Sequence, residues 1–421
     1  MKIQKPLQSV AFISLVILNH SIALVASADD WPAWRGKSGS GYSGEQSLPL
    51  TWGPETNVHW KRPVPGVGYS SPIVWKDNIV LTYADVAGQT RHVMAIDRES
   101  GNTLWDTIVA TGPIERMHHD NSPASATPIT DGSGIYVVFC IDGHLKVISL
   151  DFAGKTLWET TVGSFESAHG FSTALVLSGN RLLLSGLQDG SDAFIASLNV
   201  KDGSVLWKIP REKAIRSFSS PYLVEIQGSP AIILSGADQT IAYSCETGKT
   251  LWTLDGPASK TVSSIVVAEE LGLAYISGGR DGQFYAIRYD QIVPDRESAA
   301  DRLIAWKQTK GIPYVTSPFY HDGLLHIVSD DGIYRSYNAE TGELYANKRV
   351  GTKIDASMIG WGDKVYITDA KGKTTVIRNS AKYEVLAESD LKEPIIASPA
   401  MSNGDIVIRT TSHLYLIRET N

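Results

Sequence analysis

The connection ERMHHDNSPASATP, residues 115–128, carries the chain's densest group of side chains that could do chemistry. His118, His119, Asp120 and Asn121 bring together two imidazoles, a carboxylate and an amide. Such groups bind metal ions, transfer protons or hydrogen-bond a ligand. Neighbouring side chains of an extended segment point in opposite directions, so we expect no single metal ion to be held by both histidines. The alternative is a set of solvated loop residues, some bonded to nearby backbone.

The other reactive residue types form no recognisable catalytic or metal motif. The remaining histidines are scattered without metal-ligand spacing; examples are His59, His92, His144, His321, His326 and His413. The two cysteines, Cys140 and Cys245, are far apart, which predicts buried small residues or isolated thiols rather than a disulfide framework. The sequence contains no nucleophile elbow, phosphate loop or zinc helix motif.

A second candidate site is the segment DWPAWRG, residues 30–36. Trp31, Trp34 and Arg35 could cover a channel mouth or pack on the side of the fold, and we expect packing to be their main role. Aromatic residues beside an arginine could also stack on a sugar ring or contact a partner peptide.

An internal repeat defines the elements that must position these residues. The phrase AIDRESGNTLW (95–105) returns as SLNVKDGSVLW (197–207) and AYSCETGKTLW (242–252), and in shorter form as SLDFAGKTLW (149–158). Tryptophans end these units at intervals of 45 to 54 residues, roughly the length of a four-stranded propeller blade; they are Trp105, Trp158, Trp207, Trp252 and Trp306. We predict that each tryptophan packs on the next blade and carries no reactive role.

A second phrase, rich in Ser and Thr and followed by an apolar strand, marks eight starts. These begin at Tyr69, Ser125, Phe171, Phe218, Val262, Val315, Asp355 and Ile396. Further strands separated by Gly/Asp turns follow each start, as in antiparallel meanders. The last unit lacks a fourth strand, and NVHWKRPV (57–64) precedes the first unit in register with it.

The pattern therefore predicts an all-β, eight-bladed β-propeller of four-stranded antiparallel blades over residues 57–421, without helices. We expect the N-terminal strand to complete the last blade, because closure removes exposed strand edges. Residues 29–56 would form an extension packed on the propeller. Seven blades with extra strands is the alternative.

The connections that precede the first strands of the blades should meet at one end of a central channel. Besides residues 118–121, these connections bring polar side chains, namely Tyr69, His169, Arg216, Lys260, Tyr314 and Asp355. Together they could form a polar funnel for an anionic or hydroxylated ligand.

The repeated phrase resembles the tryptophan-docking motif of the PQQ-like β-propellers, Ala/Ser-x-Asp/Asn-x-x-Ser/Thr-Gly-x-x-x-Trp. Residues 95–105 fit it throughout, whereas Asp202 and Ser244 depart from it in later copies. The N-terminal DWPAWRGKSGSGYS is similar to a narrower group, the BamB-like secreted proteins with PQQ repeats found in planctomycete-type bacteria. The resemblance covers residues 57–421 and implies the fold; most of these proteins have no assigned activity.

The same superfamily includes quinoprotein alcohol dehydrogenases, which the resemblance describes as using a vicinal cysteine disulfide, a Ca²⁺ site and a catalytic Asp. Here Cys140 and Cys245 are not vicinal, and no residues match the metal and base motifs. We therefore expect no bound PQQ and no stoichiometric metal. A PQQ- or metal-dependent oxidoreductase with its site in the channel is the alternative.

The start of the chain and its charge indicate an exported protein. Residues 1–28 have a basic start, an apolar run and a small-residue cleavage site, which are typical of a signal peptide. No later run is long enough to cross a bilayer. A net charge of −7 without a basic run argues against nucleic-acid binding. We predict a periplasmic or secreted monomer that binds an envelope protein, a peptide or a glycan, and is not tethered by a lipidated cysteine.

Overall fold

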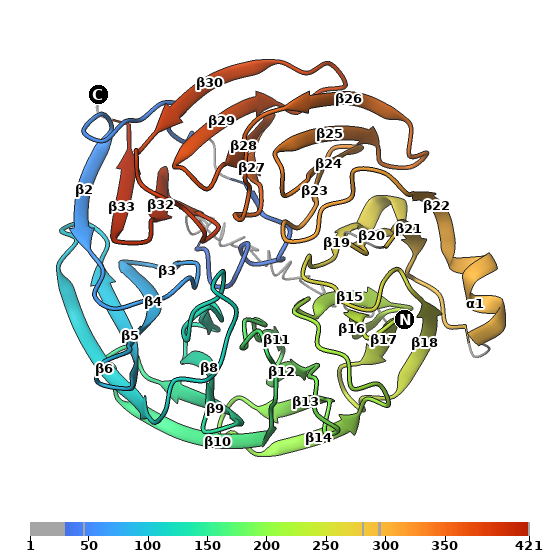
Figure 1. Ribbon diagram of the computed structural model, residues 1–421, viewed down its shortest axis with the longest axis horizontal. Coiled ribbons are helices and arrows are strands. Elements are labelled where there is room, and N and C mark those ends of the chain that lie inside the picture. Colours follow the sequence, from blue (N-terminus) through green and yellow to red (C-terminus); the bar gives the residue numbers. More distant parts are fainter. Residues whose placement is uncertain (1–29, 45–46, 280–281, 294–295, 420–421) are drawn as a thin grey trace, which may run out of the picture.

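Eight four-stranded sheets form a ring in the computed structural model, which describes residues 30–44, 47–279, 282–293 and 296–419. Figure 1 shows the blades arranged around a central axis, with the first strand of each blade innermost. The predicted eight-bladed propeller is therefore confirmed, and the seven-bladed alternative is wrong. The predicted signal peptide lies outside the described residues.

The first four blades each consist of four consecutive antiparallel strands. Blade 1 holds β3 (Ile73–Trp75), β4 (Asn78–Asp85), β5 (Thr90–Asp97) and β6 (Thr103–Thr111). Blade 2 holds β7 (Ile129–Thr130), β8 (Ile135–Ile141), β9 (His144–Leu150) and β10 (Thr156–Ser164). Blade 3 holds β11 (Val176–Ser178), β12 (Arg181–Gly186), β13 (Phe194–Asn199) and β14 (Val205–Pro210). Blade 4 holds β15 (Tyr222–Ile226), β16 (Ser229–Gly236), β17 (Gln239–Ser244) and β18 (Thr250–Asp255).

The other four blades repeat the arrangement, with strands added from the N-terminal region to the last two. Blade 5 holds β19 (Val266–Ala268), β20 (Leu273–Ser277), β21 (Phe284–Arg288) and β22 (Ile304–Gln308). Blade 6 holds β23 (Phe319–His321), β24 (Leu324–Val328), β25 (Ile333–Asn338) and β26 (Leu344–Arg349). Blade 7 holds β27 (Ile359–Trp361), β28 (Lys364–Thr368), β29 (Lys373–Arg378) and β30 (Val385–Asp390), joined by β1 (Tyr42–Ser43). Blade 8 holds β31 (Ala400–Ser402), β32 (Asp405–Arg409), β33 (His413–Arg418) and β2 (Val58–Pro63).

The ring is closed by the N-terminal strand, as the repeat register predicted. β2 pairs antiparallel with β33 and forms the outer strand of blade 8. Trp60 on β2 donates a hydrogen bond from its indole N–H to the carbonyl oxygen of Arg98 in blade 1, at 2.8 Å. The two ends of the propeller are therefore joined by a sheet and by a side chain.

The outer-strand tryptophans connect neighbouring blades. The indole N–H of Trp105 donates to the carbonyl oxygen of Phe152 in blade 2, and that of Trp158 donates to Val200 in blade 3. The same pattern recurs for Trp207, Trp252 and Trp306, which donate to Cys245, Tyr289 and Ala339. Each indole thus satisfies its donor on the turn of the following blade, where its ring is also packed.

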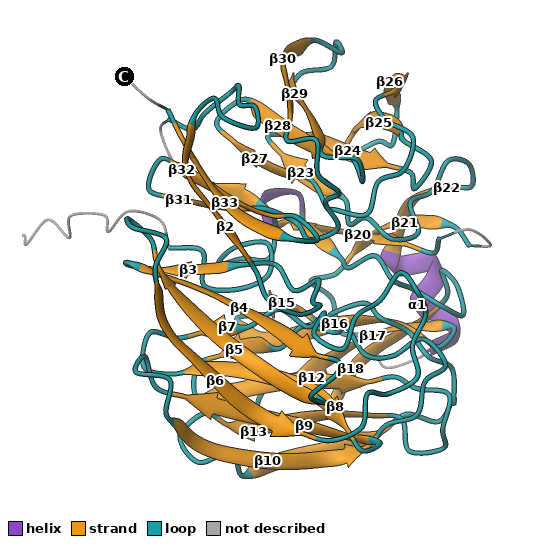
Figure 2. Ribbon diagram, turned by 60° about the vertical axis from the view of Figure 1, so that its left-hand side comes forward, coloured by secondary structure: helices purple, strands orange, loops and turns teal. Residues whose placement is uncertain are grey.

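The expectation of a chain without helices is wrong in blade 5. Helix α1 (Arg296–Leu303) precedes β22, and a short 3₁₀ turn, η1 (Glu269–Leu271), precedes β20 (Figure 2). Ala299 and Leu303 of the helix are fully buried in the cluster that contains Trp252. The sequence of the helix is rich in Ala, Leu, Glu and Arg, which favour helix. An insertion lies outside the repeat period, so the repeat could not predict its conformation.

Blades 6 and 7 have no tryptophan at the docking position. Ala346 and Ala387 occupy the register that Trp306 has in blade 5. At the junction of these blades His326 is fully buried and bonds through Nδ1 to the Tyr334 hydroxyl and through Nε2 to the Asn379 Oδ1 atom, at 2.6 and 2.7 Å. Burial lowers the pKa of His326 to about 4, so the imidazole is neutral in this network.

Candidate functional site

A cavity of about 130 Å³ lies on the axis of the ring and is lined by all eight blades and by Trp34. Its walls carry two layers of side chains, which come from the Ser/Thr-rich phrase at the start of each blade. The layer nearer the open end includes Tyr69, Ser125, Ser172, Phe218, Val262, Val315, Asp355 and Ile396. The deeper layer includes Ser71, Thr127, Ala174, Ser220, Ser264, Ser357 and Ser398.

The deeper layer forms a partial ring of hydrogen bonds, which joins blade 1 to blade 2 and runs on from blade 3 to blade 8. The backbone N–H of Ser220 donates to the hydroxyl of Ser264, whose N–H donates to Ser317, at 2.9 Å each. Equivalent bonds join Ser71 to Thr127, Ala174 to Ser220, Ser317 to Ser357 and Ser357 to Ser398. These contacts explain why the phrase keeps a hydroxyl residue at this position. The sequence signalled the residue type, and sequence reasoning did not infer the role.

Blade 3 interrupts this ring because it has alanine where the other blades have Ser or Thr. Ala174 donates its own N–H to the next blade but has no hydroxyl to accept from Thr127. The site therefore has one position where a single oxygen atom is missing from a repeated pattern.

Residues 30–43 cross one end of the axis and close the channel there. Trp31 exchanges two backbone hydrogen bonds with Val74 of blade 1, and the carbonyl oxygen of Pro32 accepts from Thr130 of blade 2. β1 pairs with β27 of blade 7 on the other side of the ring. Figure 1 shows this segment, in blue, running across the centre of the propeller. Trp34, which lies between these contacts, forms part of the cavity wall.

Arg35 anchors this crossing segment. Its side chain is 1% exposed, and its Nη2 atom donates to the carbonyl oxygens of Ser40 and Pro318, at 2.7 and 2.6 Å. Burial lowers the pKa of Arg35 to about 10, which leaves the guanidinium charged at neutral pH. Of the three predicted residues of this segment, Trp31 and Arg35 are buried in the fold and Trp34 faces the cavity.

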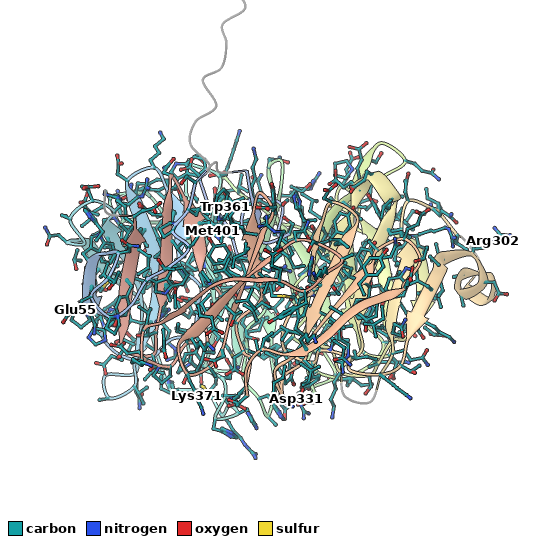
Figure 3. The ribbon with its side chains drawn as sticks, turned by 90° about the horizontal axis from the view of Figure 1, so that it is seen from above. Glu55, Arg302, Asp331, Trp361, Lys371 and Met401 are labelled. Atoms are coloured by element: carbon teal, nitrogen blue, oxygen red, sulfur yellow. The ribbon has the colours of Figure 1, made fainter. Side chains whose placement is uncertain are left out.

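The other end of the channel is open and polar. Figure 3 shows the two faces of the ring, with Trp361 and Met401 on one and Asp331 and Lys371 on the other. The crossing segment lies beside Trp361, because Ser43 of β1 pairs with it. Lys353 accepts a hydrogen bond on its carbonyl oxygen from Ala370, next to Lys371, and so marks the opposite face. We call this opening the mouth.

An ion-pair chain spans the mouth. The Lys353 ammonium lies 3.1 Å from Oδ1 of Asp120, which belongs to the connection into blade 2, and 3.3 Å from Oδ2 of Asp355 in blade 7. Partial burial opposes ionisation of Asp120, but Lys353 and the two neighbouring histidines hold its pKa below the usual value. Burial raises the pKa of Asp355 although Lys353 opposes this. Lys353 was not among the predicted residues, because an isolated lysine in a loop carries no sequence signal.

The connection at 118–121 is a turn, and the expectation that its two histidines diverge is wrong. The backbone N–H of Asn121 donates to the carbonyl oxygen of His118, which closes the turn. The His118 and His119 rings lie 4.1 Å apart between centroids, and both face Asp120, at 3.5 and 3.6 Å from its Oδ2 atom. The periodicity argument fails here because it holds only for extended backbone.

His169 and Arg216 extend this cluster along blades 3 and 4. The His169 ring stacks on His118 with centroids 5.1 Å apart and planes 5° from parallel, and its carbonyl oxygen accepts from the Asn121 amide. Arg216 pairs with Asp189 at 2.8 Å. Burial and then the charge of Arg216 lower the pKa of His169, and Lys260 contributes in the same direction.

Tyr69 and Tyr314 lie apart from the cluster. Tyr69 lines the cavity, while its backbone N–H is bonded to Ser122 and Ala124. The Tyr314 ring packs against Gly279, and its backbone N–H donates to Asp330. The predicted funnel residues thus divide into a mouth cluster, a cavity wall and one residue packed between blades.

The channel cavity is small for a cofactor of the size of PQQ. Pockets for molecules of that size have volumes of roughly 300–1,000 Å³, against about 130 Å³ here. The charged residue in the wall is Asp355, which already pairs with Lys353 at 3.3 Å. Cys140 and Cys245 are both buried free thiols in different blades, and burial raises their pKa values to about 12 and about 11.

The geometry defines the class of the protein as a PQQ-like β-propeller, with tryptophan-docked blades and a central channel that is closed at one end and has a polar mouth at the other. Residues 50–194, 89–343 and 240–413 match the family model described as outer membrane protein assembly factor BamB, and the chain belongs to this family. None of the helices in the described part of the chain combines the length and apolarity needed to cross a membrane.

Individual relatives are distant. The chain is 23% identical over 338 residues to outer membrane protein assembly factor BamB of Salmonella typhimurium, covering 75% of this chain and 84% of that protein. Among solved structures it is similar to BamB of Moraxella catarrhalis, with a TM-score of 0.59, 14% identity, and coverage of 85% of this chain and 98% of that one. It is also similar to a quinohemoprotein alcohol dehydrogenase of Comamonas testosteroni, with a TM-score of 0.67, 13% identity, and coverage of 92% and 80%. At these structural identities the likeness concerns the fold alone.

Proposed function

We propose that this protein is a non-catalytic binding module of the cell envelope, located in the periplasm or secreted, which holds a protein or peptide partner at the mouth of the propeller. Membership of the family named for outer membrane protein assembly carries the proposal. Propeller folds host many activities, so the site must supply the rest of the argument.

The mouth supports this proposal because it offers charged groups for recognition. Asp120, Lys353 and Arg216 come from three different blades and are partly exposed, so a partner could contact several blades at once. Electrostatic complementarity of this kind contributes specificity and association rate. The crossing segment closes the opposite end, so a ligand within the cavity would have to come through the mouth.

An affinity experiment with two matched variants tests the proposal. The purified chain is used to recover partners from an envelope extract, next to Lys353→Glu at the mouth and Leu157→Ser on the outer strand of blade 2, where Leu157 is 53% exposed. We expect Lys353→Glu to lose the recovered protein and Leu157→Ser to retain it. Loss with Leu157→Ser alone would place the binding surface on the outer wall. A protein that recovers no partner but is stabilised against heat by a glycan would instead be a ligand-binding module.

The rival function is a PQQ-dependent oxidoreductase, because the chain is similar in fold to a quinohemoprotein alcohol dehydrogenase. The small volume of the channel cavity argues against it. Dye-linked oxidation of alcohols after addition of PQQ and Ca²⁺, or a quinone-like absorbance band in the purified protein, would favour the oxidoreductase over the binding module.

A further inference from the structure

The turn at the mouth places three metal-ligating side chains around one point. His118, His119 and Asp120 each offer one ligand atom, and these three atoms lie within 4.8 Å of one another. The side chains are 41%, 82% and 51% exposed, so an ion from solvent could reach them without opening the fold. The three residues lie in a connection between blades and outside the strands.

The distances suit a zinc-class ion. Zinc bonds of about 2.0–2.1 Å to nitrogen and oxygen in a tetrahedron place neighbouring ligand atoms about 3.3 Å apart. Nδ1 of His118 lies 3.5 Å from Oδ2 of Asp120, and Nε2 of His119 lies 3.6 Å from the same oxygen. Shifts of a few tenths of an ångström would bring both pairs to that spacing. The third pair joins the two imidazole nitrogens, which lie within 4.8 Å of each other, and rotation of the exposed His119 ring could bring them closer.

The neighbours orient the ligands toward this point. Lys353 bonds to Oδ1 of Asp120, which leaves Oδ2 directed at the two imidazoles. Nδ1 of His118 is unprotonated and accepts a long hydrogen bond of 3.3 Å from the backbone N–H of Asp120, which a bound ion would have to displace. The parallel His169 ring holds the His118 ring in its orientation. Partners of this kind around the ligands tune metal sites in other proteins.

We propose that His118 Nδ1, His119 Nε2 and Asp120 Oδ2 form a binding site for one zinc-class divalent ion at the mouth of the channel. Two imidazoles and one carboxylate are ligands that such ions accept. Three protein ligands leave a tetrahedral ion with one position for water. The site goes beyond the proposed partner binding and does not depend on it, since an isolated chain suffices to bind the ion.

Zinc titration of the isolated chain tests this site. The full chain, purified with chelator and without a polyhistidine tag, is titrated with Zn²⁺ by calorimetry, and with Co²⁺ while its visible absorbance is recorded. We expect one Zn²⁺ per chain and a tetrahedral Co²⁺ band that Zn²⁺ abolishes. His119→Ala and Asp120→Asn should each weaken the affinity by about 10–100-fold or more, since even outer partners of a metal contribute that much.

His144→Ala is the matched control, because His144 is exposed at the start of β9 and bonds locally to the carbonyl oxygen of Asp142. It should bind Zn²⁺ like the parent. Metal-free melting curves that match the parent show that His119→Ala and Asp120→Asn remain folded. Failure to bind a stoichiometric ion at millimolar Zn²⁺, or equal binding by the parent and Asp120→Asn, would overturn the site. Partner recovery in the presence of chelator is scored separately, so either proposal can fail alone.

Discussion

Packing beneath the docking tryptophans predicts that substitution by alanine destabilises the fold much more at one glycine than at another with the same backbone conformation. Gly203 and Gly143 both have a φ of +70°. A Cβ atom at Gly203 would lie 2.4 Å from Cε3 of Trp158 and 2.5 Å from Oγ1 of Thr160, whereas one at Gly143 would meet nothing within 4 Å. Gly143→Ala therefore tests backbone strain alone, and Gly203→Ala adds the contact between blades 2 and 3.

The magnitudes follow from these distances. A left-handed conformation costs an alanine about 1–2 kcal/mol, so Gly143→Ala should lower the free energy of unfolding by that amount. Carbon atoms in contact are about 3.5–4.0 Å apart, so at Gly203 the Trp158 ring must move by about 1 Å or more. Overpacking of this kind costs about 1–3 kcal/mol, which gives about 2–5 kcal/mol in total for Gly203→Ala. The displaced ring would also strain the 3.0 Å hydrogen bond of Trp158 to the carbonyl oxygen of Val200.

Urea denaturation followed by far-ultraviolet circular dichroism measures both variants against the parent. Tryptophan fluorescence of the native state provides a second signal, which should change for Gly203→Ala and not for Gly143→Ala. Equal destabilisation of the two variants would refute the reasoning, because it would mean that the tryptophan does not occupy the space above the next blade's glycine.

Four further variants test other contacts. Ala174→Ser should raise the free energy of unfolding by about 0.5–1.5 kcal/mol, because it supplies the missing acceptor of the hydroxyl ring, while Ser264→Ala should lower it. Urea denaturation measures both values, and a free energy of unfolding equal to that of the parent in both variants would contradict these hydrogen bonds. Arg35→Met should loosen residues 30–43, because the carbonyl oxygens of Ser40 and Pro318 lose their donor, and limited proteolysis of the native protein should then cut this segment faster than in the parent. His326 has a folded-state pKa of about 4, below the value of about 6.5 in the unfolded chain. Between these two values the unfolded chain binds more protons than the folded protein. The free energy of unfolding therefore falls as the pH drops from about 6.5 towards 4. Over this range the loss should approach about 3 kcal/mol, and His326→Gln should flatten the slope in denaturation curves at pH 7.5 and 4.5; an unchanged slope would show that other groups cause it.

The repeat made most of the fold predictable. Strand alternation and Gly/Asp turns are local properties of the chain, and their recurrence gave eight blades and the closing strand at 57–64. The tryptophan spacing likewise placed a bulky donor on the outer strands, and the structure brings each one to the next blade's turn. The helix at Arg296–Leu303 was not predicted, because it lies in an insertion that has no second copy in the sequence.

The candidate site depended on closure of the ring. Asp120 and Lys353 are 233 residues apart in the chain, and only the curvature of eight blades brings them to 3.1 Å. The turn that gathers His118 and His119 on Asp120 arises from one backbone hydrogen bond, which no periodicity encodes. The path of residues 30–43 across the axis likewise depends on the assembled ring, because this segment pairs with strands of blades 1 and 7.

The sequence by itself determined the blade, its number of copies and the residue types that join one blade to the next. These depend on contacts between elements that are near in the chain or repeated along it. The tertiary structure alone decided which end of the channel is closed and which charges meet at the mouth. Those contacts join residues from distant blades, and their positions depend on the geometry of the whole ring, which no local pattern specifies.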